Sequence, residues 1–339
     1  MHDSVSQGGV SSSASSSKYA YATLITSTSY LPGAILLAHS LHYHSPHPLL
    51  LLYTPHSIPE STISALELEA KRTNVILTPV DPLLPKFDKP QNLIAERFAD
   101  TWTKLRVFQL YELGYEKICF LDADMLIFRD PGKLFKIDLP AEGDGILANG
   151  ACVCNLDKDP WAAEEWKKEN CLFTSEVHPH CLDRPKEVNS SETEEQKITY
   201  RLLNSGMFVF RPSERIWLEM MEVFNTNPTL LKSYKFPDQD FLGDFYDGKW
   251  KNVGWQYNAI KTMRYWHPDM WRDDEVVVLH YIVDKPWSKR VGEDGVAGYL
   301  GKDGETHKWW WKAYEEWEED RKREGDVEVV EVVAKYVAQ

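Results

Sequence analysis

The sequence predicts an α/β fold with a mainly parallel, Rossmann-like sheet flanked by helices. Apolar segments of strand length alternate with helical segments along residues 19–121, which is the order of strands joined by crossover helices. Residues 49–53 form a continuous apolar run, as expected for a strand that is buried on both faces. With 339 residues, 43% of them hydrophobic, the chain can bury one large core.

The first predicted elements follow one another at short intervals. Residues 19–26 are rich in β-forming side chains and predict the first strand, and residues 34–42 predict an apolar helix. The run at 49–53 predicts the second strand. An amphipathic helix is expected to begin near Pro59, and residues 75–80 predict a third strand.

A further helix and strand lead to the candidate site. Residues 103–113 predict a helix that ends at Gly114, and residues 117–121 predict the next strand. In open α/β sheets, ligands bind beyond the carboxyl ends of the strands. The residues that follow position 121 are therefore the first place to look for chemistry.

The second half of the chain has a less regular pattern. Residues at about 149–198 contain four of the five cysteines, many charges and little periodicity, and predict an insertion of irregular structure. Residues 200–211 predict a strand, residues 213–224 an amphipathic helix, and residues 275–282 a late strand rich in β-branched side chains.

The domain organisation predicted from these patterns has three parts. Residues 1–18 form a disordered, Ser-rich N-terminus, residues 19–287 form the main domain with its insertion, and residues 288–339 form a helical, acidic extension. A helix is expected in the extension at 307–323. Its aromatic stripe, which we expect to dock on the body of the protein, consists of Trp310, Tyr314 and Trp317.

Charge and hydropathy exclude several classes of protein. The formal net charge of −14 disfavours nucleic acid as a partner. Residues 1–18 contain no apolar segment of a secretory signal, and the apolar stretches at 31–41 and 49–53 are too short to span a membrane. We therefore expect a cytoplasmic protein, in which free thiols are the usual state of cysteine.

Two aspartates follow the apolar residues 118–121. Asp122 and Asp124 are two positions apart, so in an extended chain both carboxylates project to the same side. Two such anions repel each other unless they share a proton or a cation. A divalent ion held there could also bridge the oxygens of a diphosphate. The alternative is a pair of solvated carboxylates at a strand end.

His280 and Lys285 follow the late strand. A neutral imidazole at the end of a buried strand is a candidate third metal ligand, because mixed oxygen and nitrogen ligands suit manganese. A lysine before Pro286-Trp287 can offer a point charge to a phosphate. The alternative for His280 is a core histidine whose nitrogens are satisfied by hydrogen bonds.

Polar residues also interrupt the apolar strand predicted at 200–211. Asn204-Ser205-Gly206 indicates a ligand that passes close to the backbone, or else a β-bulge. Asp238 and Gln239 lie at the start of a short helix. Asp238 can be the N-cap of that helix or can hydrogen-bond sugar hydroxyls.

The cysteines of the insertion leave two alternatives open. Cys152, Cys154, Cys171 and Cys181 lie near His178 and His180, but their spacing lacks the paired CxxC knuckles of a zinc ribbon. A structural Zn²⁺ held by the four cysteines and a set of reduced, buried thiols are both compatible with the pattern.

Taken together, the motifs resemble the family 8 glycosyltransferases, the group of glycogenin and galactinol synthases, and suggest a fungal-type member. They occur in the order of that family between Tyr19 and Trp287, and the Cys-bearing insertion is similar to that of some members. The motifs that carry the resemblance are residues 21–26 with Tyr30 and Gly33-Ala34, Thr103-Lys104-Leu105, Phe120-Leu121-Asp122-Ala123-Asp124, Leu203-Asn204-Ser205-Gly206, Asp238-Gln239, His280 and Lys285-Pro286-Trp287.

The resemblance implies a GT-A fold and a retaining, Mn²⁺-dependent transfer of a hexose from UDP-glucose or UDP-galactose. It implies a small-molecule or glycan acceptor and leaves a homodimer open. The implied metal ligands are Asp122, Asp124 and His280, and the implied catalytic residues are Asn204, Asp238 and Gln239. The implied donor-binding residues are Leu24, Thr26, Tyr30, Lys104, Asp122, Ala123, Asp124, Asn204, Gly206 and Lys285.

The sequence departs from the family pattern in two places. Family members often have a glycine between the metal-binding histidine and the lysine, where this chain has Ile282-Val283-Asp284. Phe241-Leu242-Gly243 replaces the usual Leu-Asn after Asp240. The first departure weakens the predicted phosphate contacts, and the second weakens the prediction for the acceptor side.

The motifs are also compatible with two other functions and with two mechanisms of transfer. A phosphatase of the haloacid dehalogenase type would use Asp122 as a nucleophile beside Mg²⁺, and a non-catalytic protein would only bind the nucleotide sugar. Retention by a transferase could use Asp238 as a covalent nucleophile. We favour attack on the same face as the departing diphosphate, in which the protein mainly positions groups and stabilises charge.

Overall fold

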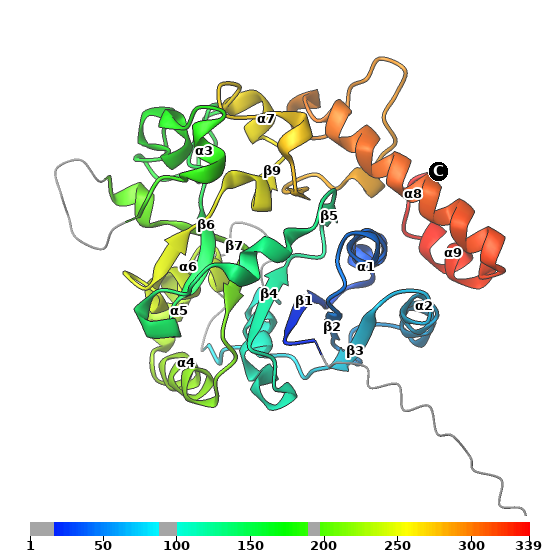
Figure 1. Cartoon of the computed structure of the whole chain (residues 1–339), viewed down its shortest axis with the longest axis horizontal. Helices are drawn as coiled ribbons and strands as arrows, with labels where there is room; N and C mark the ends of the chain where they lie inside the picture. Colours follow the sequence, from blue (N-terminus) through cyan, green and yellow to red (C-terminus); the bar gives the residue numbers. More distant parts are fainter. Residues whose placement is uncertain (1–16, 88–99, 189–196) are drawn as a thin grey trace, which may run out of the picture.

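The structure is a computed structural model that describes residues 17–87, 100–188 and 197–339. Its centre is a seven-stranded sheet with the strand order β3-β2-β1-β4-β7-β6-β8 (Figure 1). The strands are β1 (Tyr19–Ile25), β2 (Leu49–Tyr53), β3 (Val75–Pro79), β4 (Lys117–Leu121), β6 (Ile146–Gly150), β7 (Leu203–Phe210) and β8 (Trp250–Asn252).

The sheet is mainly parallel, as predicted. Neighbours among β3, β2, β1 and β4 are parallel, and so are β6 and β8. β7 is antiparallel to both β4 and β6. Because β7 runs in the opposite direction, its first residues lie at the same edge of the sheet as the last residues of β4.

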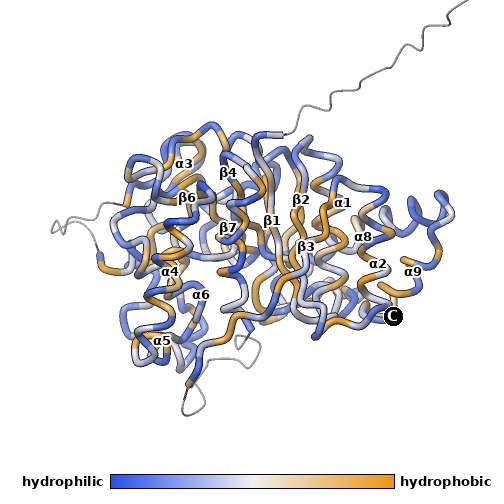
Figure 2. The backbone as a smooth tube through the Cα atoms, turned by 90° about the horizontal axis from the view of Figure 1, so that it is seen from below, coloured by the Kyte–Doolittle hydropathy of each residue, from blue (hydrophilic) through white to orange (hydrophobic). Residues whose placement is uncertain are grey.

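Helices cover both faces of this sheet. On one face, α4 (Glu214–Thr226), α5 (Pro228–Ser233), α6 (Pro237–Phe245) and the 3-10 segment η3 (Thr101–Leu113) pack with Phe120 and Phe208. On the other face lies α1 (Leu31–His44). Its Leu37 and Leu41 belong to the same buried hydrophobic cluster as Tyr21 of β1. Figure 2 shows apolar residues along α1 and the central strands, with hydrophilic residues on the outer loops.

A second sheet, which the sequence patterns do not predict, has three short strands in the order β5-β10-β9. They are β5 (Met125–Ile127), β10 (Val278–His280) and β9 (Ala259–Ile260). The strand predicted at 275–282 is therefore shorter than expected, because Asp273–Glu275 form a 3-10 turn and only 278–280 pair with β5.

The C-terminal helices pack beside the N-terminal half of the chain. In α8 (Gly304–Glu324) the predicted aromatic stripe of Trp310, Tyr314 and Trp317 is buried, which confirms that it docks. The unpredicted α9 (Val327–Ala334) lies against α2 (Glu60–Ala70), as Figure 1 shows in red and blue. The predicted division into three parts stays a prediction.

Two other sequence expectations concern the chain as a whole. The predicted disordered N-terminus falls mostly on residues 1–16, which lie outside the described residues. Within the three described ranges, none of the helices combines the length and the apolar character that crossing a bilayer requires.

Candidate active site

A pocket of about 520 Å³ lies where the carboxyl ends of β1 and β4 meet the first residues of β7 and the end of β10. It gathers residues that are far apart in the sequence, and every predicted site residue lines it. They are Leu24, Thr26, Tyr30, Lys104, Asp122, Ala123, Asp124, Asn204, Gly206, Asp238, Gln239, His280 and Lys285. Residues predicted from separate motifs therefore share one pocket.

The two carboxylates lie on a short turn between β4 and β5. The backbone NH of Asp122 donates to the Gly206 carbonyl at 2.8 Å, and the NH of Tyr281 donates to the Asp124 carbonyl at 2.9 Å. Helix α1 packs against this turn at Gly33, where a Cβ would lie 2.3 Å from the Ala123 carbonyl oxygen. The turn is thus fixed by backbone contacts on several sides.

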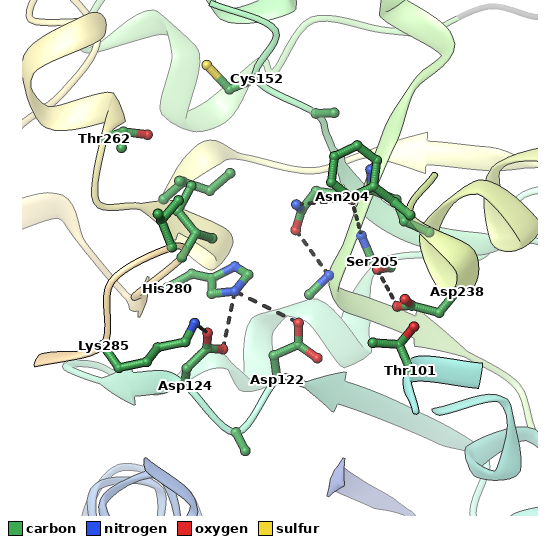
Figure 3. A pocket seen from close by; sticks show the side chains of 18 of the residues that line it. Thr101, Asp122, Asp124, Cys152, Asn204, Ser205, Asp238, Thr262, His280 and Lys285 are labelled. Carbon is green, nitrogen blue, oxygen red and sulfur yellow. Dashed lines mark hydrogen bonds and ion pairs between the residues drawn. The ribbon is translucent and has the colours of Figure 1, made fainter. Parts of the chain in front are cut away.

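The second sheet brings His280 to the carboxylates, because the register of β5 and β10 pairs His280 with Met125. The imidazole Nε2 lies 3.3 Å from Asp124 Oδ1 and 3.8 Å from Asp122 Oδ2. These three side chains converge in Figure 3, and their ligand atoms lie within 4.8 Å of one another. His280 therefore lies beside both carboxylates, at the place where the third metal ligand was predicted.

Asn258 orients this imidazole and was not identified from the sequence. Its Oδ1 lies 2.9 Å from His280 Nδ1, which fits an Nδ1–H that donates to this oxygen and leaves Nε2 as the ring nitrogen facing the carboxylates. Asn258 Nδ2 in turn donates to Asn204 Oδ1 at 2.8 Å, and Asn204 Nδ2 donates to Gln239 Oε1 at 3.3 Å. In the sequence, the only indication of this role was that an asparagine directly precedes the apolar pair Ala259-Ile260.

Gly206 lines the pocket, and its missing side chain also has a steric role. A Cβ at this position would lie 2.4 Å from Cε1 of His280. The glycine therefore makes room for the imidazole, which packs directly on β7.

Lys104 is a buried cation between two carboxylates. Its Nζ lies 2.9 Å from Asp122 Oδ1 and 2.6 Å from Asp238 Oδ2, and Ser205 Oγ donates to Asp238 Oδ2 at 2.8 Å. Although burial opposes it, the two carboxylates raise the pKa of Lys104. The same ion pair holds the pKa of Asp238 below its usual value against the effect of burial.

Asp238 is consequently not the N-cap of α6. The N-cap position belongs to Phe236, and Asp238 lies within the first turn of the helix with its side chain directed to Lys104 and Ser205. Figure 3 shows Asp238 beside Ser205 and facing Thr101.

Lys285 approaches the site from the segment after β10. Its Nζ contacts Asp124 Oδ2, donates to the Tyr281 carbonyl at 2.9 Å and lies 5.5 Å from the centre of the Tyr30 ring. Burial opposes ionisation of Asp124, but Lys285 and His280 outweigh it and lower the pKa of that carboxyl. Burial and the charge of Asp124 raise the pKa of Asp122, with Lys104 opposing them.

This geometry, two carboxylates and an imidazole beside a lysine at the end of a parallel strand, agrees with the comparison to known families. Residues 22–290 match glycosyl transferase family 8. The chain belongs to this family. It is therefore a glycosyltransferase, and this identification replaces the phosphatase and the non-catalytic alternatives.

Individual relatives support the same assignment. The glycosyltransferase is 25% identical to galactinol synthase 1 of Solanum lycopersicum, over 91% of its own length and 86% of that protein. It also resembles two solved structures, each at 16% sequence identity. The galactosyltransferase LgtC matches with a TM-score of 0.52, over 86% of this chain and 94% of LgtC. The glycosyltransferase GlyE of Streptococcus pneumoniae matches with a TM-score of 0.54, over 87% of this chain. The chain spans 60% of the length of GlyE. These likenesses confirm the GT-A fold.

The far wall of the pocket in this glycosyltransferase comes from the insertion, and its residues were not among the predicted donor-binding or catalytic residues. Cys152 and Cys154 line it, followed by the carboxylates of Asp157 and Asp159 and by the rings of Trp161 and Trp166. The sequence placed these residues in irregular structure and offered no indication of which of them face the pocket.

The predicted set of four cysteines is wrong in one member. Cys152, Cys154 and Cys171 lie together, but their fourth neighbour is His267 and not Cys181, which is buried elsewhere. His178 and His180 also lie outside this group. His267 is 96 residues beyond Cys171, so the cysteine spacing contained no signal for it.

Proposed function

We propose that this glycosyltransferase transfers a hexose, glucose or galactose, from a UDP-sugar to an acceptor hydroxyl with retention of configuration, in a Mn²⁺-dependent reaction. The observation that carries this proposal is the convergence of Asp122, Asp124 and His280 within 4.8 Å at the end of β4. Lys285 lies beside them on the same side of the pocket.

The side chains present fit a divalent cation. Two carboxylates and a neutral imidazole form the mixed oxygen and nitrogen set that suits manganese. The hydrogen bond from His280 Nδ1 to Asn258 leaves Nε2 available as a ligand. When bound, the ion would neutralise the charge that develops on the departing diphosphate. Asp122, Asp124 and His280 are the residues that would hold it.

The donor would extend along the pocket from β1 to α6. We assign the uridine to Leu24, Thr26 and Tyr30, which line the pocket near the ends of β1 and α1. Ala123 and Lys285 would then meet the diphosphate, because Ala123 lies between the two aspartates in the chain and Lys285 contacts Asp124. The hexose would face Asn204, Gly206, Asp238 and Gln239 on the opposite side. Lys104 would act on the donor through Asp122 and Asp238, with which it is paired.

Retention is assigned to attack on the same face as the leaving group. The Asp238 carboxylate is held by Lys104 and Ser205, and an ion-paired carboxylate is a weak nucleophile. In the proposed step the bond from the anomeric carbon to the diphosphate oxygen breaks as the bond to the acceptor oxygen forms. The acceptor proton passes to the diphosphate oxygen. The protein holds both partners in place and excludes water.

The acceptor would bind between the hexose and the insertion. Trp161 and Trp166 contribute aromatic side chains to this wall, and Asp157 and Asp159 contribute carboxylates that can accept hydrogen bonds from hydroxyl groups. This wall suits a small polyol or a short glycan. Because the curated relative is named a galactinol synthase, galactose donors are the first to be tested.

A cytoplasmic location and a homodimer complete the proposal. The five cysteines of the chain are free thiols, which agrees with a reducing compartment. Cell fractionation and light scattering on the purified chain test these two points.

The function is tested by measuring UDP release from a panel of UDP-sugars with and without Mn²⁺, in the presence of polyols, monosaccharides or short glycans. We expect release that depends on the metal and is fastest with UDP-glucose or UDP-galactose. The anomeric configuration of the product, read by NMR, should equal that of the donor. Release of phosphate from phosphomonoesters, with no UDP released from any donor, would contradict the proposal.

A further inference from the structure

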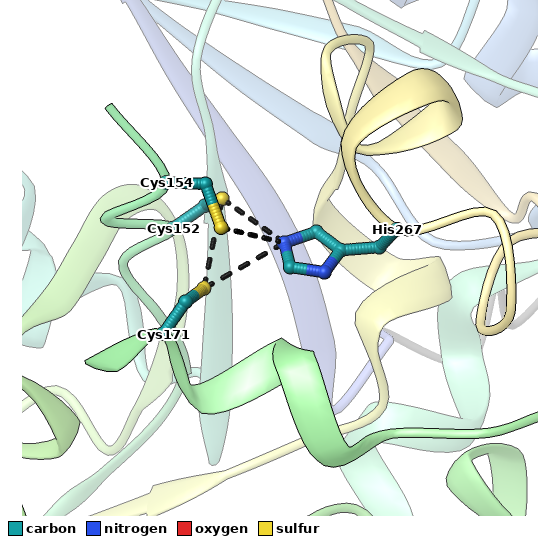
Figure 4. Close-up of side chains that lie close together, drawn as sticks. All are labelled: Cys152, Cys154, Cys171 and His267. Carbon is teal, nitrogen blue, oxygen red and sulfur yellow. Dashed lines mark hydrogen bonds between the residues drawn. The ribbon is translucent and has the colours of Figure 1, made fainter. Parts of the chain in front are cut away.

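Four potential metal ligands lie together outside the carboxylate site (Figure 4). His267 Nε2 lies 3.4 Å from Cys152 Sγ, 3.3 Å from Cys154 Sγ and 3.6 Å from Cys171 Sγ. The sulfurs of Cys152 and Cys171 are 3.7 Å apart. We call these four residues the thiol–imidazole cluster. One nitrogen thus faces three sulfurs, which in turn face one another.

These separations match the edges of a tetrahedral zinc site. Zn–S bonds of about 2.3 Å and a Zn–N bond of about 2.0–2.1 Å place two sulfurs about 3.8 Å apart, and a sulfur and a nitrogen about 3.6 Å apart. A disulfide would instead bring two sulfurs to about 2.05 Å. The observed distances therefore fit four ligands around one ion and are too long for a disulfide.

The local chain conformation explains why the atoms converge. Cys152 and Cys154 are two residues apart just after β6, so their side chains project to the same side while Val153 is buried in the core. Cys171 begins the 3-10 turn η7 (Leu172–Ser175) as its N-cap. His267 is the C-cap of α7 (Met263–Trp266), and the ring of Phe173 contacts its imidazole edge-on.

Cysteine binds zinc as a thiolate, so three clustered sulfurs need a positive charge beside them. A soft divalent ion at the centre of the cluster would supply that charge.

The described part of the insertion has little regular structure of its own. Between β6 and β7 the structure shows only short 3-10 turns and the four-residue α3 (His180–Asp183). A metal bound to the cluster would join three separate segments of chain, because its ligands come from the residues after β6, from η7 and from α7. A bound metal of this kind stabilises a small irregular region that buries too little apolar surface to hold its own conformation.

The cluster also borders the active-site pocket. Cys152 and Cys154 line it, and the residues between Cys154 and Cys171 contribute Asp157, Asp159, Trp161 and Trp166 to the same wall. In Figure 3, Cys152 lies on the opposite side of the pocket from Asp122 and Asp124. A link at the cluster would therefore hold the wall that, under the proposed function, faces the acceptor.

We propose that Cys152, Cys154, Cys171 and His267 bind one structural Zn²⁺ that fixes the insertion against α7 and so shapes the acceptor wall of the pocket. Three thiolates and an imidazole in tetrahedral arrangement are typical of zinc. Four protein ligands complete the coordination, so the ion takes no direct part in the transfer. Only the statement about the acceptor wall rests on the proposed function.

The first test measures metal in the full-length protein, purified without chelators, by mass spectrometry of the elements. We expect about one zinc ion per chain. Replacement by Co²⁺ should give the thiolate-to-cobalt charge-transfer absorption of a sulfur-rich tetrahedral site. Failure to bind zinc even when it is added, or a disulfide between two of the three cysteines, would overturn the proposal. These measurements use the unaltered protein and do not depend on how a variant folds.

Variants then assign the ligands. Cys171→Ser and His267→Gln should lose zinc and lower Tm by several degrees, whereas Cys181→Ser and Cys119→Ser, which alter buried thiols outside the cluster, should retain it. Loss of zinc from Cys181→Ser together with retention by Cys171→Ser would refute this ligand set.

Asp124→Asn separates this proposal from the proposed function. That variant should keep its zinc and its cobalt spectrum while losing Mn²⁺-dependent turnover. Zinc retained in a protein that transfers no hexose would refute the function alone. Hexose transfer by a protein that never binds zinc would refute the zinc site alone.

Discussion

Lys104 and Gly206 show how single residues determine the geometry of the active site. Lys104 forms ion pairs with both Asp122 and Asp238, and its positive charge allows the two carboxylates to lie in one pocket. Gly206 provides the space in which His280 lies against β7. Neither role was predicted, because each depends on contacts between segments far apart in the sequence.

The space at Gly206 leads to a prediction about metal binding. In Gly206→Ala, the new Cβ would overlap Cε1 of His280, so the imidazole must move away from the carboxylates. We expect Mn²⁺ affinity and turnover to fall about 10- to 100-fold. Calorimetric titration with Mn²⁺ measures this change. Gly243→Ala is the matched control, because no atom lies within 4 Å of its Cβ position. Equal Mn²⁺ affinity in both variants would contradict the assigned role.

Val283, in the segment between His280 and Lys285, has a strained backbone conformation. Its φ of 62° lies in the left-handed region, which costs a β-branched residue roughly 1–2 kcal/mol. Val283→Gly should therefore raise the free energy of unfolding by about 1 kcal/mol, after the added chain entropy of glycine is counted.

Chemical denaturation measures this change at Val283. The matched control is Val296→Gly, at a valine that is also exposed but has no positive φ, and it should destabilise the protein. If both variants were destabilised equally, the strain at Val283 would be disproved.

At the scale of elements, the junction of α8 with α1 and α2 holds the C-terminal region in place. Arg321 of α8 pairs with Glu69 of α2 at 2.6 Å, and Trp317 Nε1 donates to the same carboxylate at 3.0 Å. Both partners are almost completely buried. Such a pair is costly to break from one side, because the remaining charge loses its partner in a low-dielectric environment.

Removing the carboxylate of Glu69 should destabilise this junction. We expect Glu69→Ala to lower the free energy of unfolding by about 3–5 kcal/mol. Glu67→Ala, on the exposed side of the same helix, should change it by less than about 0.5 kcal/mol. Urea unfolding followed by circular dichroism compares the two, and equal stabilities would show that α8 does not depend on the pair.

His39 makes the same junction sensitive to acid. Burial, followed by the charge of Arg321, lowers the pKa of His39 to about 4, and Asp320 only partly opposes them; His42 is the other nearby titratable group. In the unfolded chain the imidazole titrates near 6.5. Between these values the unfolded chain binds a proton that the folded protein does not bind, so stability falls as the pH decreases from 6.5 to 4.

Between pH 6.5 and pH 4, protonation of His39 in the unfolded chain should lower the free energy of unfolding by about 3 kcal/mol, which is about 1.4 kcal/mol per pH unit. His307, whose pKa is lowered to about 3 by burial and by Lys261, adds to the loss in the same direction. His39→Gln should flatten the dependence of Tm on pH between 6.5 and 4. An unchanged slope in that variant would exclude His39 as a cause.

The first four predicted strands agree closely with β1 to β4, because each is a local apolar run bounded by turn residues. The second sheet was not predicted, since its pairing joins residues 125–127 with 278–280 and each strand is too short for a pattern. His280 could nevertheless be named as a candidate, because it ends an apolar run and precedes Lys285. Asn258 and His267 had no comparable signal.

For the whole molecule, one arrangement explains how distant segments build one site. The antiparallel β7 brings Asn204 and Gly206 to the edge where β4 ends, and the second sheet adds His280 there. The insertion then closes the far side of the pocket with Cys152 and Cys154. The GT-A fold thus places the proposed donor site on regular elements and the proposed acceptor wall on irregular ones.

The central claim is that the carboxylates beside His280 hold the metal that hexose transfer requires. The most direct test compares Mn²⁺-dependent UDP release by the unaltered protein, by Asp124→Asn and by the exposed control Asp247→Asn. We predict that Asp124→Asn loses at least about 100-fold in turnover, with its fold and zinc content unchanged, while Asp247→Asn keeps full activity. Undiminished UDP release by Asp124→Asn would contradict the claim.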